Sequence, residues 1–193
     1  LLERLIAFPT VSNHSNRDLI SFISHYLAGL GVDHHIFSDE SGRKEGLIAH
    51  IGPQVEGGVI LSGHTDVVST DRQFWRRDPW VLTEEDGFFF GRGTCDMKGF
   101  VAIALAAVPK MVAQPLQRPI QLAFSYDEEQ GCLGTLPLVH ALAQHFPRAS
   151  SVIVGEPTMM KVVTGHKGGI GMMTTLRGKA AHSSMPSRGV SAI

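Results

Sequence analysis

Three apolar segments of this chain each run directly into residues that bind divalent cations. Residues 57–63 precede His64-Thr65-Asp66, residues 119–126 precede Asp127-Glu128-Glu129, and residues 151–155 precede Glu156. In an open α/β sheet, ligands bind at the edge where such strands end. Because an imidazole and several carboxylates are zinc ligands, this pattern predicts a metal site, and hydrolysis is the chemistry that such a site supports.

His64 and Asp66 are two residues apart, so their side chains point to one side if the strand geometry continues past His64. Asp66 would then accept the hydrogen of one ring nitrogen of His64 and leave the other nitrogen for a metal. The alternative is an ordinary histidine and aspartate in a turn.

Asp96 is the only acidic residue in the glycine-rich loop 91–99, which precedes an apolar helix. Its two carboxylate oxygens could bridge two cations. Alternatively, Asp96 could cap the helix, since anions are favoured at helix N-termini.

The run Asp127-Glu128-Glu129 places three like charges side by side, which is costly unless a cation or solvent screens them. On an extended segment Glu128 and Glu129 point opposite ways, so one could bind a metal while the other reaches the water beside it. A solvated acidic turn is the alternative. Glu156, kept extended by Pro157, could be a plain exposed glutamate. A single metal site explains all these acidic groups together better than separate coincidences.

The overall composition excludes several classes of protein. The chain has 193 residues, 43% of them hydrophobic, with 17 basic and 18 acidic residues. This balance gives no basic stripe for nucleic acid, and no apolar segment is long enough for a membrane span. We therefore expect a cytoplasmic protein that binds neither nucleic acid nor membrane. Cys95 and Cys132 are expected to be reduced, buried thiols.

Helical and strand patterns alternate along the chain, which predicts an α/β fold. Helices are expected at 15–30, with a capping signature from Ser15 and Asp18, at 97–112, bent or shortened by Pro109, and at 134–146. The helix at 97–112 is apolar nearly all round, so it should be buried on most sides. Two further strands are expected at 32–37 and 47–51.

The composition changes after Gly165 to a glycine-rich and then strand-like segment. We expect residues 1–166 to form the first part of one domain and residues 167–193 to begin a second, incomplete one. The first residues already have a helical pattern, so we expect the chain to be part of a longer protein.

The motifs SGHTDVV, GRGTCDMKG, SYDEEQGCLG, VGEPT and GKAAHSSMP are together similar to those of a known family. The chain resembles the dinuclear zinc deacylases and exopeptidases, which include aminoacylase, carboxypeptidase G, succinyl-diaminopimelate desuccinylase and acetylornithine deacetylase. The segments FPTVSNHSN, GTCDMKGF and GHKGG are most similar to the acetylornithine deacetylase branch. The family fold is a three-layer catalytic domain with a mixed central sheet and a small α+β lid domain through which the subunits dimerise.

The resemblance implies a role for each motif residue. His64 and Glu156 would bind one Zn²⁺, Glu129 the second, and Asp96 both, with Co²⁺ as a possible substitute. Glu128 would be the general base, and Asp66 would orient His64. By itself, His182 is more often explained as a surface histidine, but the resemblance makes it the lid residue that reaches the reaction centre of a partner subunit. Relatives supply one further histidine ligand from a later segment, which no residue here replaces.

The implied reaction is the hydrolysis of the amide bond of an N-acyl amino acid, most closely of N-acetylornithine to ornithine and acetate in arginine biosynthesis. Desuccinylase, aminoacylase and dipeptidase activities are alternatives within the family. Outside the enzymes, the chain could be a metal-binding or dimerising relative without catalysis. Two departures from the family pattern are GVSAI, where relatives have an Asn before the Ala, and the loop 69–73.

Overall fold

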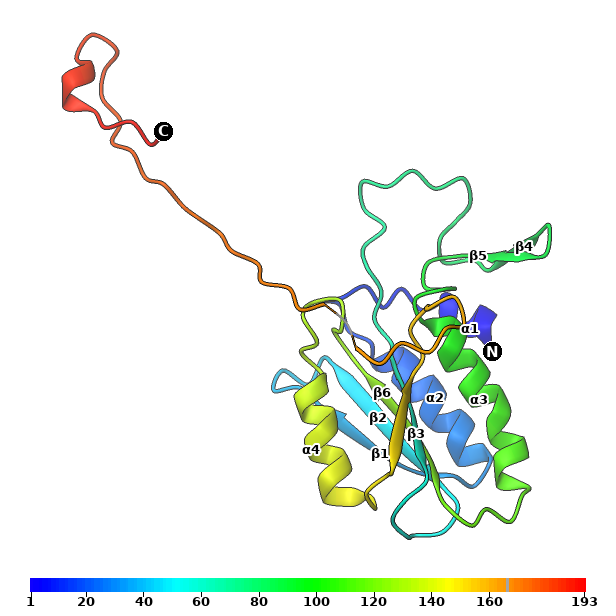
Figure 1. Cartoon of the computed structure of the whole chain (residues 1–193). Coiled ribbons are helices and arrows are strands. Elements are labelled where there is room, and N and C mark those ends of the chain that lie inside the picture. The colour runs from blue at the N-terminus through cyan, green and yellow to red at the C-terminus, as the bar shows by residue number, and fades with distance from the viewer. Residues whose placement is uncertain (166) are drawn as a thin grey trace. The chain divides into compact units, whose positions relative to one another are not determined.

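The computed structural model describes residues 1–165 and 167–193 and divides them into two compact units, Leu1–Met159 and Met160–Ile193. The first unit contains a five-stranded mixed sheet in the order β1-β2-β6-β3-β7 (Figure 1). Strands β1 and β2 are antiparallel to their neighbours, whereas β6, β3 and β7 run parallel to one another. The strands are β1 Asp33–Ser38, β2 Glu45–Ile51, β3 Val59–His64, β6 Ile120–Ser125 and β7 Ser151–Val154.

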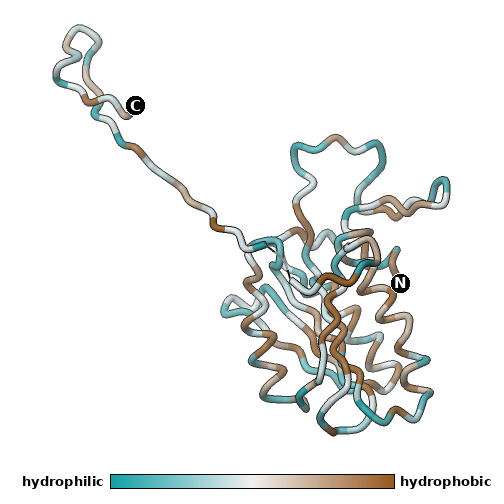
Figure 2. The backbone as a smooth tube through the Cα atoms, viewed as in Figure 1, coloured by the Kyte–Doolittle hydropathy of each residue, from teal (hydrophilic) through white to brown (hydrophobic). Residues whose placement is uncertain are grey.

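Helices cover both faces of this sheet and give it three layers (Figure 1). The helices are α1 Leu2–Ile6, α2 Arg17–Gly29, α3 Lys98–Val112 and α4 Thr135–His145. On one face, α2 and α3 pack against buried residues such as Leu122 and Phe124. On the other face, α4 packs against Ile48, Ile60 and Ala123. Figure 2 shows the central strands as largely hydrophobic, as expected for strands covered on both faces. The predicted three-layer α/β fold with a mixed sheet is confirmed.

The start of α2 and the effect of Pro109 on α3 differ from the prediction. Helix α2 begins at Arg17 with Asn16 at the cap position, and among the described residues the Asn16 side chain makes no cap hydrogen bond, so the predicted cap at Ser15 is one residue too early. The hydroxyl of Ser15 accepts the N–H of Arg17 at 3.4 Å. The Asn16 side chain instead donates to the carbonyl of Glu45 at 2.7 Å. Helix α3 ends at Val112, as predicted, and Pro109 does not shorten it. Pro109 cannot donate to the carbonyl of Leu105, but the hydroxyl of Tyr26 does so at 3.1 Å.

Two burial predictions are also wrong. Helix α3 is buried along one face only, and Ile103 is 70% exposed. Cys95 and Cys132 are both free but exposed, because they lie in the loops that follow the strand ends and not in the packed layers. A short hairpin, β4 Thr83–Glu85 and β5 Phe88–Phe90, was not predicted.

The described residues of the unit Met160–Ile193 form one 3₁₀ turn, η1 Pro186–Arg188, and one isolated bridge between Lys179 and Val190. The expected strand after residue 170 is not formed within the described residues, since no neighbouring strand of this unit pairs with it. The division between units follows Met159, whereas the predicted domain change lies at His166, which is outside the described residues. Among the residues that the structure describes, no helix is long and apolar enough to cross a membrane.

Candidate metal centre

Three parallel strands end at one edge of the sheet, and each carries a candidate ligand there. His64 is the last residue of β3, Glu128 lies three residues beyond β6, and Glu156 lies two residues beyond β7. The loop that enters α3 brings Asp96 to the same edge. Since parallel strands expose their carboxyl ends together, residues far apart in sequence meet at this position.

The Nε2 atom of His64 lies among three carboxylates. It is 3.0 Å from Oδ1 of Asp96, 3.7 Å from Oε1 of Glu156 and 3.8 Å from Oε2 of Glu128. The imidazole side chain is 1% exposed, whereas the three carboxylates are between 36% and 50% exposed. A buried nitrogen therefore faces a group of oxygens that solvent can reach.

Two sets of ligand atoms are close enough to hold a metal. One set comes from His64, Asp96 and Glu129, and the other from His64, Glu128 and Glu156, with all atoms of a set within 4.8 Å of one another. Imidazole nitrogen and carboxylate oxygen are zinc donors, so these residues fit the ion that the sequence predicts. No side-chain hydrogen bond caps the start of α3, so the structure does not use Asp96 as a helix cap.

The orientation of the His64 ring is fixed from its other nitrogen. Its Nδ1 atom lies 2.9 Å from the backbone carbonyl of Asp66 and 3.4 Å from Oδ1 of the same residue. Sequence reasoning anticipated Asp66 as the partner but assigned the contact to its carboxylate alone. A ring held at Nδ1 leaves Nε2 for a metal, as is usual for ligating histidines.

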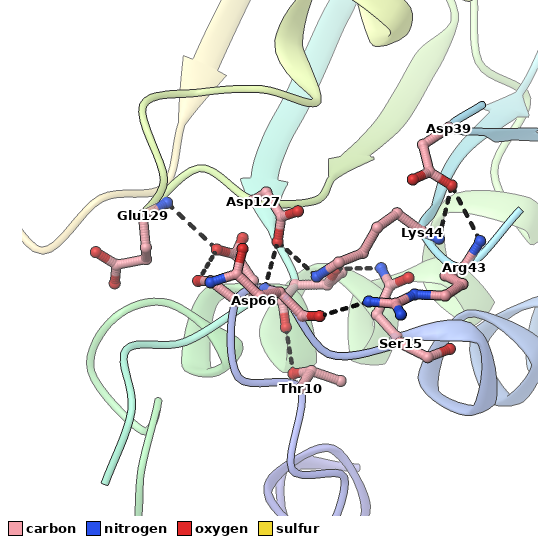
Figure 3. Close-up of polar contacts among 12 residues, drawn as sticks. Thr10, Ser15, Asp39, Arg43, Lys44, Asp66, Asp127 and Glu129 are labelled. Atoms are coloured by element: carbon pink, nitrogen blue, oxygen red, sulfur yellow. Dashed lines mark hydrogen bonds and ion pairs between the residues drawn. The ribbon is translucent and has the colours of Figure 1, made fainter. Parts of the chain in front are cut away.

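Asp66 is completely buried and accepts hydrogen bonds from two separate parts of the chain (Figure 3). The hydroxyl of Ser12 donates to it at 2.7 Å, and the backbone N–H groups of Glu128 and Glu129 donate at 3.0 Å and 3.2 Å. Burial alone would raise the pKa of Asp66, but the hydrogen bonds from His64 and Ser12 outweigh it and lower the pKa. Asp66 is therefore an anion that links His64 to the acidic turn.

The surrounding carboxylates raise the pKa of the His64 imidazole. Burial lowers the pKa of its imidazole, but the hydrogen bond and charge of Asp66 and the charges of Glu156 and Glu128 raise it to about 9. Burial also raises the pKa of Glu129, and the nearby Asp96 raises it further. Without a cation, these groups thus favour a proton on His64 and repel one another, and a divalent cation would relieve both effects.

Sequence reasoning missed two buried lysines that support this centre. Lys98 donates from Nζ to the carbonyls of Leu5 at 2.9 Å and Phe8 at 2.7 Å, and burial lowers its pKa to about 7 against the opposing charge of Asp66. Lys44 forms a buried ion pair with Asp127. A lysine within the apolar pattern of α3 was a usable signal for Lys98, whereas nothing local marks Lys44.

His182 lies in the unit Met160–Ile193, and its Nδ1 atom is 2.9 Å from the hydroxyl of Ser184. Its side chain is exposed within that unit. The lid role assigned to it stays a prediction.

Comparison with known proteins identifies the family. Residues 60–185, which contain all seven candidate site residues, match the profile of peptidase family M20/M25/M40. The chain belongs to this family. Its M20 catalytic fold accounts for the parallel strand ends and for the convergence of His64 with the carboxylates.

Specific relatives within the M20 family are similar over the whole chain. It is 41% identical over 201 residues to acetylornithine deacetylase of Pasteurella multocida (strain Pm70) and 38% identical over 200 residues to that of Shigella sonnei (strain Ss046). Each alignment covers 100% of this chain and 51% of the relative, so the chain spans about half the length of these proteins. The crystal structure of human carnosine dipeptidase 1 matches 79% of this chain and 37% of its own, with a TM-score of 0.68 and 26% identity.

Proposed function

We propose that the complete protein is a zinc-dependent amidohydrolase that removes the acyl group from an N-acyl amino acid, with N-acetylornithine as the first candidate substrate. The observation that carries this proposal is the group of three carboxylates within 3.8 Å of Nε2 of His64, a nitrogen whose ring is held from the other side. The identities of 41% and 38% to two acetylornithine deacetylases support the substrate, and the products would be ornithine and acetate of arginine biosynthesis.

The ligand sets support a site for two Zn²⁺ ions, with Co²⁺ as a possible substitute. From the family resemblance, His64 and Glu156 would hold one ion, Glu129 the other, and Asp96 both. In the structure, the close ligand atoms group Asp96 with His64 and Glu129, and Glu128 with His64 and Glu156. When bound, the ions would polarise the substrate carbonyl and make a water molecule more acidic. Asp66 would keep the His64 ring in the orientation that presents Nε2.

Glu128 has the position that a general base needs. Its backbone N–H is fixed by Asp66, and its carboxylate, 37% exposed, reaches the edge of the ligand group. Glu128 would take a proton from the attacking water and give it to the amine that leaves when the amide C–N bond breaks. The carboxylate thereby returns to its starting charge at the end of each turnover.

The unit that follows the catalytic residues is proposed to begin the lid and dimerisation domain, as assigned to residues 167–193 from the sequence. In a homodimer, His182 would donate a hydrogen bond to the oxyanion that forms at the reaction centre of the other subunit. A cytoplasmic location is proposed with this function.

A dipeptidase is the second candidate, because the structure of human carnosine dipeptidase 1 matches this fold at 26% identity. N-acetylornithine, other N-acyl amino acids and dipeptides given in parallel to the complete protein distinguish these functions. Faster hydrolysis of a dipeptide than of every N-acyl amino acid would replace the first candidate with the second.

Glu128→Gln in the complete protein tests the proposed chemistry. The amide has nearly the same shape but cannot take a proton, so kcat should fall by about 10²–10⁴-fold while zinc content is retained. The control is Glu40→Gln, which alters an exposed glutamate outside the site. Loss of zinc from Glu128→Gln would assign Glu128 to metal binding, and an unchanged kcat would remove it from the mechanism.

A further inference from the structure

Asp127 carries a charge that the proposed chemistry does not use. It precedes Glu128 and Glu129, yet its side chain points away from that of Glu129 and toward Lys44 (Figure 3). Its backbone lies in the left-handed region, with φ of 47°, which an aspartate tolerates better than most residues. The carboxylate is buried and lies 2.5 Å from Nζ of Lys44, and the two side chains are 9% and 6% exposed.

Lys44 is itself held in place by local hydrogen bonds. Oδ1 of Asp39 accepts the backbone N–H groups of Arg43 and Lys44, each at 3.0 Å, which fixes the end of the β1–β2 hairpin. The guanidinium of Arg43 donates to the carbonyl of Asn13 at 2.9 Å, and the N–H of Asn13 lies 3.4 Å from Oδ1 of Asp127. Lys44 therefore reaches Asp127 from a segment whose backbone is held by hydrogen bonds.

The acidic turn is consequently fixed on two sides. On one side, Lys44 binds the Asp127 side chain, and on the other, Asp66 accepts the N–H groups of Glu128 and Glu129. Both sets of bonds end on the three consecutive residues 127–129. A shift at Asp127 therefore moves the backbone that carries both glutamates. A displacement of about 1 Å at a catalytic group can lower a rate by about a hundredfold.

We infer that Lys44 is a positioning residue, whose buried ion pair with Asp127 sets where the carboxylates of Glu128 and Glu129 lie at the metal centre. This inference rests on the proposed function for its catalytic readout. A contribution to stability alone is a poor explanation for the pair, because replacing both members of a buried ion pair by neutral groups of similar size is often neutral for stability.

The test compares Lys44→Met with the double variant Lys44→Met/Asp127→Asn in the complete protein. The single variant leaves a buried carboxylate unpaired, so its unfolding temperature should fall. The double variant removes that charge, so its unfolding temperature should recover. Its kcat should nevertheless remain about tenfold to a hundredfold below that of wild type, and its KM should change by less than about threefold. Zinc affinity, measured by chelator competition, should also remain about tenfold or more below wild type, as for other groups that orient metal ligands.

The matched control is Arg17→Met, which breaks the exposed ion pair between Arg17 and Glu45 at the same hairpin. It should leave kcat and zinc affinity unchanged. If the double variant regains wild-type kcat and zinc affinity, the pair serves stability only and the inference is wrong. If the wild-type protein hydrolyses neither N-acyl amino acids nor dipeptides, the proposed function fails. The zinc affinity of the double variant then decides the inference alone. Weaker zinc binding than in wild type supports the inference, and wild-type zinc binding overturns it.

Discussion

Ser12 and Asp66 lie 54 residues apart, yet the hydroxyl of Ser12 donates to Oδ2 of Asp66 at 2.7 Å within the buried part of the molecule. This bond ties the segment before α2 to Asp66, whose backbone carbonyl holds the His64 ring and whose carboxylate accepts the backbone N–H groups of the acidic turn. The N-terminal segment therefore contacts the residues that follow His64 and hold its ring in place. Nearby, the hydroxyl of Thr10 donates to the carbonyl of Thr65 at 2.6 Å (Figure 3).

Ser12→Ala should lower the free energy of unfolding of the metal-free protein by about 1–3 kcal/mol, because a buried carboxylate loses a donor. Urea denaturation at neutral pH measures this change. Ser41→Ala, which removes an exposed hydroxyl that donates to Asp39, should change it by less than about 0.5 kcal/mol. If the two substitutions change the free energy of unfolding equally, the buried Ser12 hydrogen bond contributes no more to stability than the exposed one of Ser41.

Zinc binding should weaken as the pH falls. The pKa of His64 in the metal-free chain is about 9, so at neutral pH the ring must lose a proton before Nε2 can bind an ion. Protonation is favoured below that pKa, and the apparent affinity should fall by about tenfold for each pH unit below it. Chelator competition from about pH 6.5 to about pH 8.5 measures the slope. Affinity that is independent of pH would exclude His64 as a ligand.

The two candidate ligands Asp96 and Glu129 should differ in their effect on zinc content. Asp96→Ala should remove both ions, since Asp96 is the proposed shared ligand, whereas Glu129→Ala should remove one. Asp86→Ala, in the exposed β4–β5 turn, is the control and should keep both. Metal analysis after dialysis gives the counts. Full zinc content in Glu129→Ala would contradict its assignment.

Lys98 should make stability depend on pH. Burial lowers its pKa from 10.5 to about 7, so between these values the unfolded chain binds more protons than the folded one. The free energy of unfolding contributed by Lys98 therefore rises with pH across this window. The difference in unfolding free energy between wild type and Lys98→Met should grow from pH 7 to pH 9, and Lys110→Met, an exposed site on the same helix, should show no such trend. A constant difference would mean that Lys98 keeps its ordinary pKa.

Some of this centre could be predicted from the sequence because its ligands follow apolar strands. An acid after an apolar segment marks a strand end, and strand ends meet at one edge of an open sheet, so the convergence of His64 with several carboxylates could be predicted without coordinates. The pairing of His64 with Glu156 on one ion came from the family resemblance. Ser12 and Lys44 could not be found in this way. Their partners lie 54 and 83 residues away, and neither local periodicity nor spacing encodes a contact that depends on how the hairpin and N-terminal segment pack. The hydroxyl of Tyr26, which donates to the carbonyl of Leu105 four residues before Pro109, likewise comes from another helix.

The proposed zinc centre is tested most directly by a crystal structure of the complete protein grown with Zn²⁺, with the ions located by anomalous scattering. Two zinc ions are expected at the sheet edge, one bound by Nε2 of His64 and Glu156, the other by Glu129, with Asp96 bound to both. Ions bound elsewhere, or a single ion that His64 and Asp96 do not contact, would contradict this expectation.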